Sequence, residues 1–183
     1  MVDAVELVRQ RLLRASGALR AAGVPYAVVG GNAVAAWVAT VDRGAVRNTQ
    51  DVNILVRRAD FEAAKAALTG AGFVYRHAAK LDLFLDGPDA SPREAVHMIF
   101  ANEMVREGEP AANPDVSESQ DMGSFQVLGL EALVKIKLTA FRRKDQVHLL
   151  DMLEVGLIDA TWVKRLPPVL GARLQELIDS PDA

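Results

Sequence analysis

Hydrophobic residues at three- and four-residue spacing open the chain. They are Val5, Val8, Leu12, Ala15 and Leu19. Because this spacing places apolar side chains on one face of a helix, it predicts an amphipathic helix over the first twenty residues. Gly23 and Pro25 follow it and are expected to end it.

Short apolar runs separated by turn residues come next. The predicted strands are 26–29, 51–56, 81–85 and 95–100, and the predicted helices are 33–40 and 59–68. In the strand 51–56, alternation places Asp51 and Asn53 on one face, while the apolar residues between and after them lie on the other. Gly70 is the expected stop of the second helix.

The second half of the chain consists of an acidic loop segment followed by a helical segment. Residues 106–123 are acidic and rich in loop formers, without a defensible period, and residues from 130 onward are helical, with stops near Gly156 and at Pro167-Pro168. This order predicts an α+β fold, a small mixed sheet flanked by helices, and not a doubly wound Rossmann sheet. We divide the chain into a core, 1–129, and a helical carboxy-terminal part, 130–183, packed on it.

Composition narrows the class of protein. The chain has 183 residues, 21 Lys and Arg, 24 Asp and Glu, and a net charge of −3, which excludes binding of nucleic acid by bulk positive charge. It has no cysteine, so disulfides, thiolate zinc sites and cysteine nucleophiles are excluded and a reducing cytoplasm is the expected location. No secretory signal and no membrane-spanning segment is expected.

The first candidate binding site is the pair Gly30-Gly31, followed by Asn32. A strand that runs through two glycines into a helix leaves free backbone amides, where phosphate can approach closely. The same pair is also explained by turn geometry alone. The pattern by itself leaves both explanations open.

The second candidate is the polar segment from Arg47 through Thr49 to Asp51 and Asn53. Two oxygen-bearing side chains one residue apart on a strand point the same way and can share a divalent cation. The alternative is a polar loop that opens a strand with Asp.

Together, the Gly30-Gly31 turn and the Arg47-x-Thr49-x-Asp51-x-Asn53 strand resemble the DNA polymerase beta superfamily of nucleotidyltransferases, most of all its minimal and AbiEii-type toxin-like families. The resemblance implies a nucleoside triphosphate at the glycine turn and Mg²⁺ or Mn²⁺ on carboxylates. It also implies transfer of a nucleoside monophosphate to RNA (tRNA included), protein or a small molecule, and a cognate antitoxin as a possible partner.

Two positions depart from this family pattern. Asn53 stands where a second aspartate is expected, and His97 stands where the third carboxylate of a later strand is expected. An amide brings no negative charge, and neutral imidazole is a poor ligand for Mg²⁺. Nearby Asp82, Asp86 and Glu94 are alternative sources of the missing charge.

A third candidate lies on the carboxy-terminal helices. Lys137 is expected beside the apolar edge of a helix, and by the resemblance it serves the nucleotide phosphates. The alternative is a solvated basic helix end, with Asp145 capping the next helix. His148 lies three residues from both Asp145 and Asp151, which favours a surface ion-pair cluster over a metal site. His77 has no partner identifiable from the sequence.

These residues support two main hypotheses. One is a nucleotidyltransferase whose activity is weak or lost, with Asp51, Asn53 and Lys137 as catalytic candidates. The other is a non-catalytic module that binds a nucleotide or a partner. A third option is a protein-binding surface formed by the acidic loop 107–121 and the basic helix end.

Overall fold

A seven-stranded mixed sheet forms the centre of the molecule, which the computed structural model describes over residues 3–182. Its order is β3-β4-β5-β2-β1-β7-β6. The strands are β1 (Tyr26–Val29), β2 (Val52–Val56), β3 (Val74–Ala78), β4 (Leu81–Leu85), β5 (Ala95–Phe100), β6 (Ser119–Asp121) and β7 (Gln126–Leu128). The helices are α1 (Ala4–Ala21), α2 (Gly30–Ala39), α3 (Phe61–Gly70), α4 (Leu130–Ala140), α5 (Arg143–Glu154) and α6 (Pro168–Asp179).

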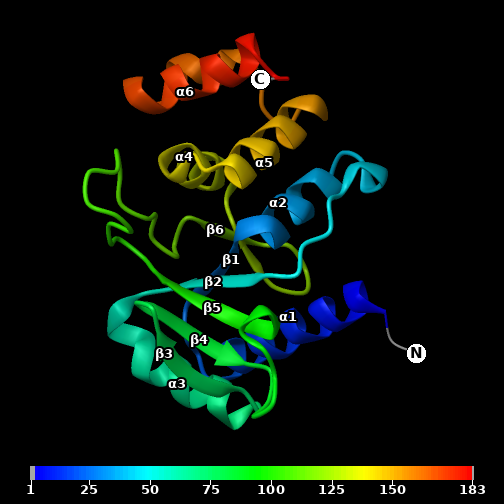
Figure 1. Ribbon diagram of the computed structural model, residues 1–183, viewed down its shortest axis with the longest axis vertical. Helices are drawn as coiled ribbons and strands as arrows, with labels where there is room; N and C mark the ends of the chain where they lie inside the picture. Colours follow the sequence, from blue (N-terminus) through cyan, green and yellow to red (C-terminus); the bar gives the residue numbers. More distant parts are fainter. Residues whose placement is uncertain (1–2, 183) are drawn as a thin grey trace.

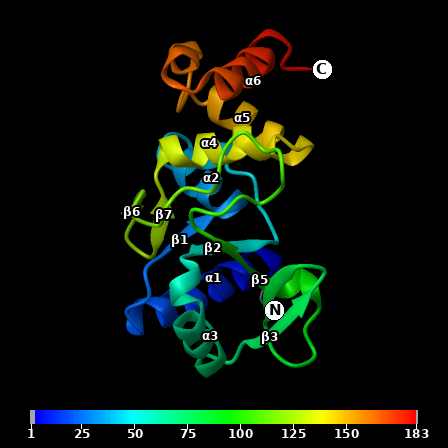
Figure 2. The same cartoon turned by 90° about the vertical axis from the view of Figure 1, so that its left-hand side faces the viewer.

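Helices cover both faces of this sheet. Figures 1 and 2 show α1 and α3 on one side, and α2 with the carboxy-terminal helices α4, α5 and α6 on the other. The α1 and α3 side holds an apolar core that includes Leu19, Ile54 and Phe84. The opposite side holds a second core, in which Ala27 and Leu55 of the sheet pack with helical residues such as Leu133. The α+β architecture predicted from the sequence is therefore confirmed.

The centre of the sheet fixes which residues lie side by side. Strand β1 runs antiparallel to β2, and β2 runs parallel to β5. All four residues of β1 are buried, as are four of the five residues of β2, because helices cover both faces there. The exception in β2 is the half-buried Asn53.

Three strands were not predicted. Strand β3 carries polar residues at the sheet edge, where one side of the backbone is unpaired and exposure weakens the apolar alternation. Strands β6 and β7 have three residues each, too few to show a period, and β6 lies in the segment expected to be a loop. Strand β7 pairs parallel with β1, so the sheet extends beyond the predicted four strands.

The carboxy-terminal helices share a core with the sheet. One buried cluster joins Val34 and Val127 to Leu138, Leu149 and Leu174. Arg173 of α6 also donates hydrogen bonds from Nη1 to the carbonyl oxygens of Leu138 and Thr139, at 2.7 and 2.9 Å. The division at residue 129 stays a prediction. Within residues 3–182, no helix is both long and apolar enough to span a bilayer.

Candidate functional site

The turn from β1 into α2 requires glycine. Gly30 has φ +69°, and a Cβ added there would lie 2.7 Å from Nδ2 of Asn53. A Cβ on Gly31 would lie 3.0 Å from Cβ of Thr49. Any larger residue would therefore collide with the neighbouring strand or its approach. The two glycines let the start of α2 lie directly against Thr49 and Asn53, so the structure brings together the two sequence motifs.

Asn32 fastens this turn to the start of β2. Its Nδ2 donates a hydrogen bond to the carbonyl oxygen of Asp51 at 2.7 Å, across 19 residues of sequence. The backbone N–H of Asp51 in turn donates to Oγ1 of Thr49 at 3.4 Å. Asp51 is thus held by its main chain, and its carboxylate takes part in neither bond. The Asn32 side chain has a structural partner within the protein.

Asn53 and His97 lie next to each other across the sheet. They are register partners on the parallel strands β2 and β5, and Val29 is the partner of Asn53 on β1. Because register partners point to the same face, Asn53 and His97 both face the α2 side of the sheet. Each is half-buried. The fold therefore places the His97 imidazole next to the Asn53 amide, and the role of both as site residues stays a prediction.

The carboxylates that could replace the missing charge are engaged elsewhere. Asp86 accepts hydrogen bonds from Arg14 and from Nε of Arg11, the latter at 3.0 Å. Burial alone would raise the pKa of Asp86, but the hydrogen bonds from both arginines outweigh it and hold the pKa below its usual value. Asp86 is therefore tied to α1, on the other side of the sheet.

Asp82 and Glu94 also form hydrogen bonds with other residues. Asp82 accepts from the Tyr75 hydroxyl at 2.7 Å and lies 3.0 Å from Nδ1 of His77, so His77 does have a partner. Asp82 pairs in register with Met98 and so faces away from His97. Glu94 accepts from the backbone N–H of Ser91 at 3.2 Å in a capping box. Within the described chain these residues leave Asp51 as the carboxylate beside the turn.

The donor set at the turn does not fit a pair of magnesium ions. No group of three or more His, Asp or Glu side chains that could hold a metal ion occurs within residues 3–182. Two-metal sites hold their ions about 3.5–4 Å apart, which requires several anionic ligands. Here one carboxylate, one amide and one imidazole are present, and Mg²⁺ binds through carboxylates and water. The chain offers too little negative charge for two divalent ions.

Arg47 lies in an ion pair with helix α5. Its Nε and Nη2 donate to the two carboxylate oxygens of Asp151, at 2.9 and 3.1 Å. The hydrogen bond that Arg47 donates to Asp151 raises the pKa of Arg47. Asp151 lies 104 residues away in sequence, so local spacing gave no signal for this contact. The pair borders a surface hollow of about 540 Å³ that Asp42 and Glu154 also line.

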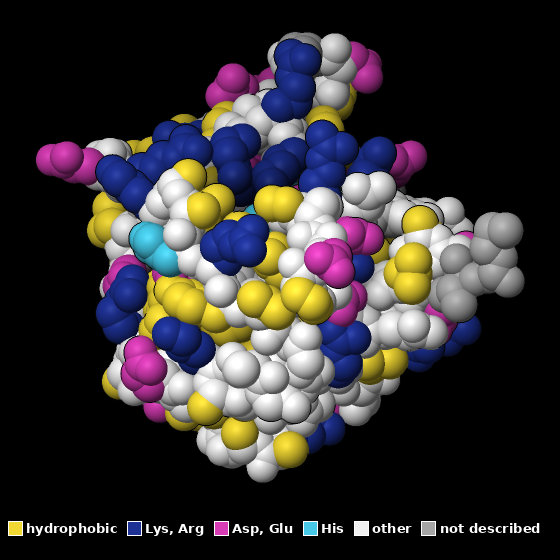
Figure 3. All heavy atoms as spheres, turned by 60° about the horizontal axis from the view of Figure 1, so that its bottom comes forward, with side chains coloured by type: hydrophobic (Ala, Val, Ile, Leu, Met, Phe, Trp, Pro, Cys, Tyr) yellow, Lys and Arg dark blue, Asp and Glu magenta, His cyan; other side chains and the backbone are white. Residues whose placement is uncertain are grey.

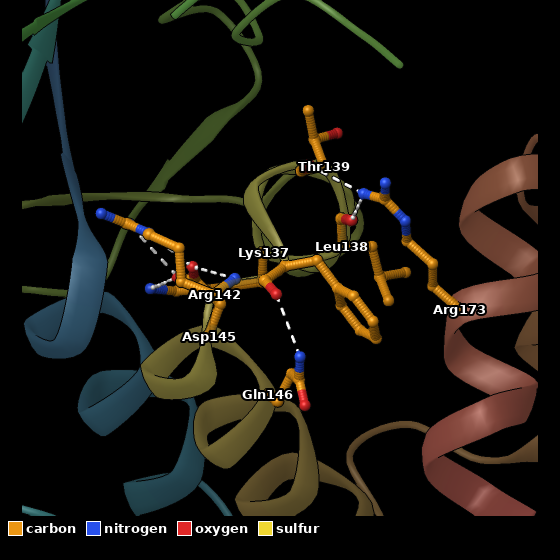
Figure 4. Close-up of polar contacts among 8 residues, drawn as sticks. Lys137, Leu138, Thr139, Arg142, Asp145, Gln146 and Arg173 are labelled. Atoms are coloured by element: carbon orange, nitrogen blue, oxygen red, sulfur yellow. Dashed lines mark hydrogen bonds and ion pairs between the residues drawn. The ribbon is translucent and has the colours of Figure 1, made fainter. Parts of the chain in front are cut away.

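Lys137 is buried, not poised at an exposed helix edge. Its Nζ donates to Oδ1 of Asp145 at 3.1 Å, and the two side chains are 6% and 1% exposed. Arg142 contributes Nε at 2.8 Å and its backbone N–H at 3.0 Å to the same carboxylate (Figure 4). Burial lowers the pKa of Lys137 despite the adjacent Asp145. The helix cap is Arg142, and Asp145 completes a capping box three residues on, which corrects the expectation that Asp145 is the cap.

His148 does not belong to a surface ion-pair cluster. Its Nδ1 is buried and has no hydrogen-bond partner within the described residues. Burial first, and then the positive charge of Lys137, lower the pKa of His148 to about 4. The ring is therefore neutral at pH 7. The cluster expected from the i, i+3 spacing with Asp145 and Asp151 is wrong, because the helix packs this face inward.

The acidic loop is partly neutralised by basic residues of the same chain. Arg57 forms a two-pronged contact with Asp115, at 3.0 and 2.9 Å, and that contact holds the pKa of Asp115 far below its usual value. Met104 and Val105, just before this loop, are exposed. On the face drawn in Figure 3, Lys and Arg side chains form a band above a group of hydrophobic ones. Within residues 3–182, no hydrogen bond or ion pair links the loop to the basic helix end, and the predicted protein-binding surface stays a prediction.

Comparisons with known proteins support the fold. No protein-family model matches the chain, and no curated protein matches it significantly. Among solved structures, the antibiotic-resistance factor ANT(2'')-Ia has a TM-score of 0.56 at 15% identity, over 94% of this chain and 92% of that one. A candidate nucleotidyltransferase from H. pylori has 0.54 at 14%, over 100% and 80%. JHP933 from Helicobacter pylori has 0.53 at 14%, over 100% and 77%. The chain has the nucleotidyltransferase fold.

Proposed function

We propose that this protein binds a nucleoside triphosphate at the turn between β1 and α2, and that its nucleotidyl transfer activity is weak or lost. One observation carries the proposal: Gly30 and Gly31 bring the start of α2 against Thr49 and Asn53, and Asn32 of the same helix start bonds the main chain of Asp51. Free amides at a helix start bind phosphate. The likeness to nucleotidyltransferase structures supports a nucleotide as the ligand.

The expected loss of transfer follows from charge. Transfer of a nucleoside monophosphate develops negative charge on the phosphates, which metal ions and basic side chains must stabilise. Asn53 and His97 give no anionic support to metal ions, and Arg47 and Lys137 are each bonded to an aspartate. If transfer occurs, Mg²⁺ or Mn²⁺ at Asp51 is the metal it would use. An RNA or protein acceptor and an antitoxin partner rest on the resemblance alone.

Two measurements test this proposal. The first is calorimetric titration of the protein with ATP, GTP, CTP and UTP, and we expect at least one of them to bind. The second is incubation with labelled triphosphate, Mg²⁺ or Mn²⁺, and either tRNA or the protein itself as acceptor, and we expect little transfer. Robust transfer that disappears in Asp51→Ala would show an active enzyme. Failure of all four nucleotides to bind would reject the nucleotide site.

A further inference from the structure

The side chains at the turn carry less negative charge than a two-metal site needs. Asn53 contributes an amide. Its Nδ2 lies so close to Gly30 that a Cβ added to Gly30 would be only 2.7 Å from this nitrogen. His97 is the neighbouring residue on β5 and contributes an imidazole. Amide N–H groups donate hydrogen bonds, and neutral imidazole both donates and accepts. Such groups can bond phosphate oxygens directly, without an intervening cation.

The rest of the chain does not restore that charge. Asp86 is held by two arginines of α1, and Asp82 faces the opposite side of the sheet. Glu94 is used in a capping box. Asp51 alone carries too little negative charge to offset the repulsion between two divalent ions. A single carboxylate also repels a bound polyphosphate less strongly than three carboxylates would.

We infer that this site binds its nucleotide as the metal-free polyphosphate anion, with the Asn53 amide and the His97 imidazole facing the phosphates. This inference rests on the proposed nucleotide site and goes beyond it, because it assigns the ionic form of the ligand. Because Mg²⁺ in solution complexes the polyphosphate and so competes with the site, nucleotide affinity is then highest without divalent metal. Asn53 and His97 act as direct contacts to phosphate, not as weak metal ligands.

The unmodified protein gives the decisive measurement. ATP is titrated by calorimetry in two buffers of equal ionic strength, one with EDTA and one with excess Mg²⁺. We expect the apparent dissociation constant to be about ten-fold or more higher in excess Mg²⁺ than in EDTA, because Mg²⁺ removes the free anion from solution. Equal dissociation constants would show that the site does not select the metal-free form and would overturn the inference. Binding that requires Mg²⁺ overturns the inference and leaves the proposed nucleotide site intact. Absence of binding in both buffers overturns both.

A pair of substitutions tests the contacts themselves. Asn53→Asp together with His97→Asp places three carboxylates at the turn, so we expect affinity in EDTA to fall by about ten-fold or more through charge repulsion, and Mg²⁺ to restore it. Gln120→Glu adds charge on the distant strand β6 and should leave affinity unchanged in both buffers. Unchanged affinity of the double variant in EDTA would overturn the assignment. If that variant does not fold, the two-buffer comparison still decides.

Discussion

Single residues at this turn have conformational requirements that substitution can measure. Gly30→Ala forces an L residue into φ +69° and directs its Cβ at Asn53. We expect a loss of about 1–2 kcal/mol in the free energy of unfolding, measured by chemical denaturation, together with weaker nucleotide binding.

Gly17→Ala is the matched control for that change. Gly17 lies inside α1, and a Cβ there would meet nothing within 4 Å. Since glycine weakens a helix interior, this variant should gain about 0.5–1 kcal/mol and bind nucleotide as the unmodified protein does. A Gly30→Ala protein as stable as Gly17→Ala would contradict the description of the turn.

The buried ion pair predicts an asymmetry between its two partners. Asp145→Asn leaves the ammonium of Lys137 buried without a counter-charge, and such losses are about 3–5 kcal/mol. Lys137→Met leaves Asp145 bonded to Arg142, so the loss should be about half as large or less. Urea denaturation of both variants measures the difference. A larger loss for Lys137→Met would show that Lys137 is the more important partner.

His148 predicts a pH dependence of stability. Its pKa is about 4 in the folded protein, against about 6.5 in the unfolded chain. As pH falls from about 6.5 to 4, the unfolded state takes up a proton that the folded state does not, so the free energy of unfolding decreases in this window. Above pH 7 the contribution is constant.

The substitution His148→Gln isolates this contribution. Because the ring is partly solvated, we expect the unmodified protein to lose about 1–2 kcal/mol relative to His148→Gln between pH 7 and pH 4.5. Thermal or urea denaturation at several pH values measures it. Parallel stability curves for the two proteins would show that the ring titrates normally.

At the scale of elements, the Arg47–Asp151 ion pair ties the segment before β2 to helix α5. The resemblance noted in the sequence makes Arg47 a predicted nucleotide-binding residue, and under that prediction Asp151 competes with the nucleotide for the guanidinium. Asp151→Asn should therefore raise nucleotide affinity by about two- to five-fold, as expected for releasing an exposed pair. Calorimetric titration measures the change.

A double-mutant cycle separates this competition from a nonspecific charge effect. Arg47→Ala should weaken nucleotide binding, and Arg47→Ala combined with Asp151→Asn should bind like Arg47→Ala alone, because no guanidinium remains to be released. If Asp151→Asn raises affinity equally in both backgrounds, the effect comes from the removed negative charge and not from Arg47.

At the scale of the whole molecule, the helices after residue 129 complete the core over one face of the sheet. Without them, buried residues such as Val34, Val38 and Leu128 would be exposed to water. We expect a chain ending at residue 129 to show no cooperative thermal transition, and the intact chain to show one. Two separate calorimetric transitions in the intact chain would contradict this shared core.

The sequence predicted the parts of the fold that have local signals. Helix α1 and strands β1 and β2 were found where expected, whereas α2 begins at Gly30, three residues before the predicted start at Ala33, so the glycine pair forms the first turn of the helix. The short strands β6 and β7 were missed, because three residues carry no measurable period and their pairing depends on a distant partner, β1.

By itself the sequence determined the fold class and the presence of an amide at position 53 and an imidazole at position 97, since the identity of a side chain is independent of its surroundings. Only the tertiary structure decided which charged side chains form ion pairs within the protein. Arg47 and Lys137 carry the residue types of a phosphate site, yet each contacts an aspartate of α5. These pairings arise because packing of α4 and α5 against the sheet brings distant side chains within hydrogen-bond range, and no local pattern along the chain encodes that proximity.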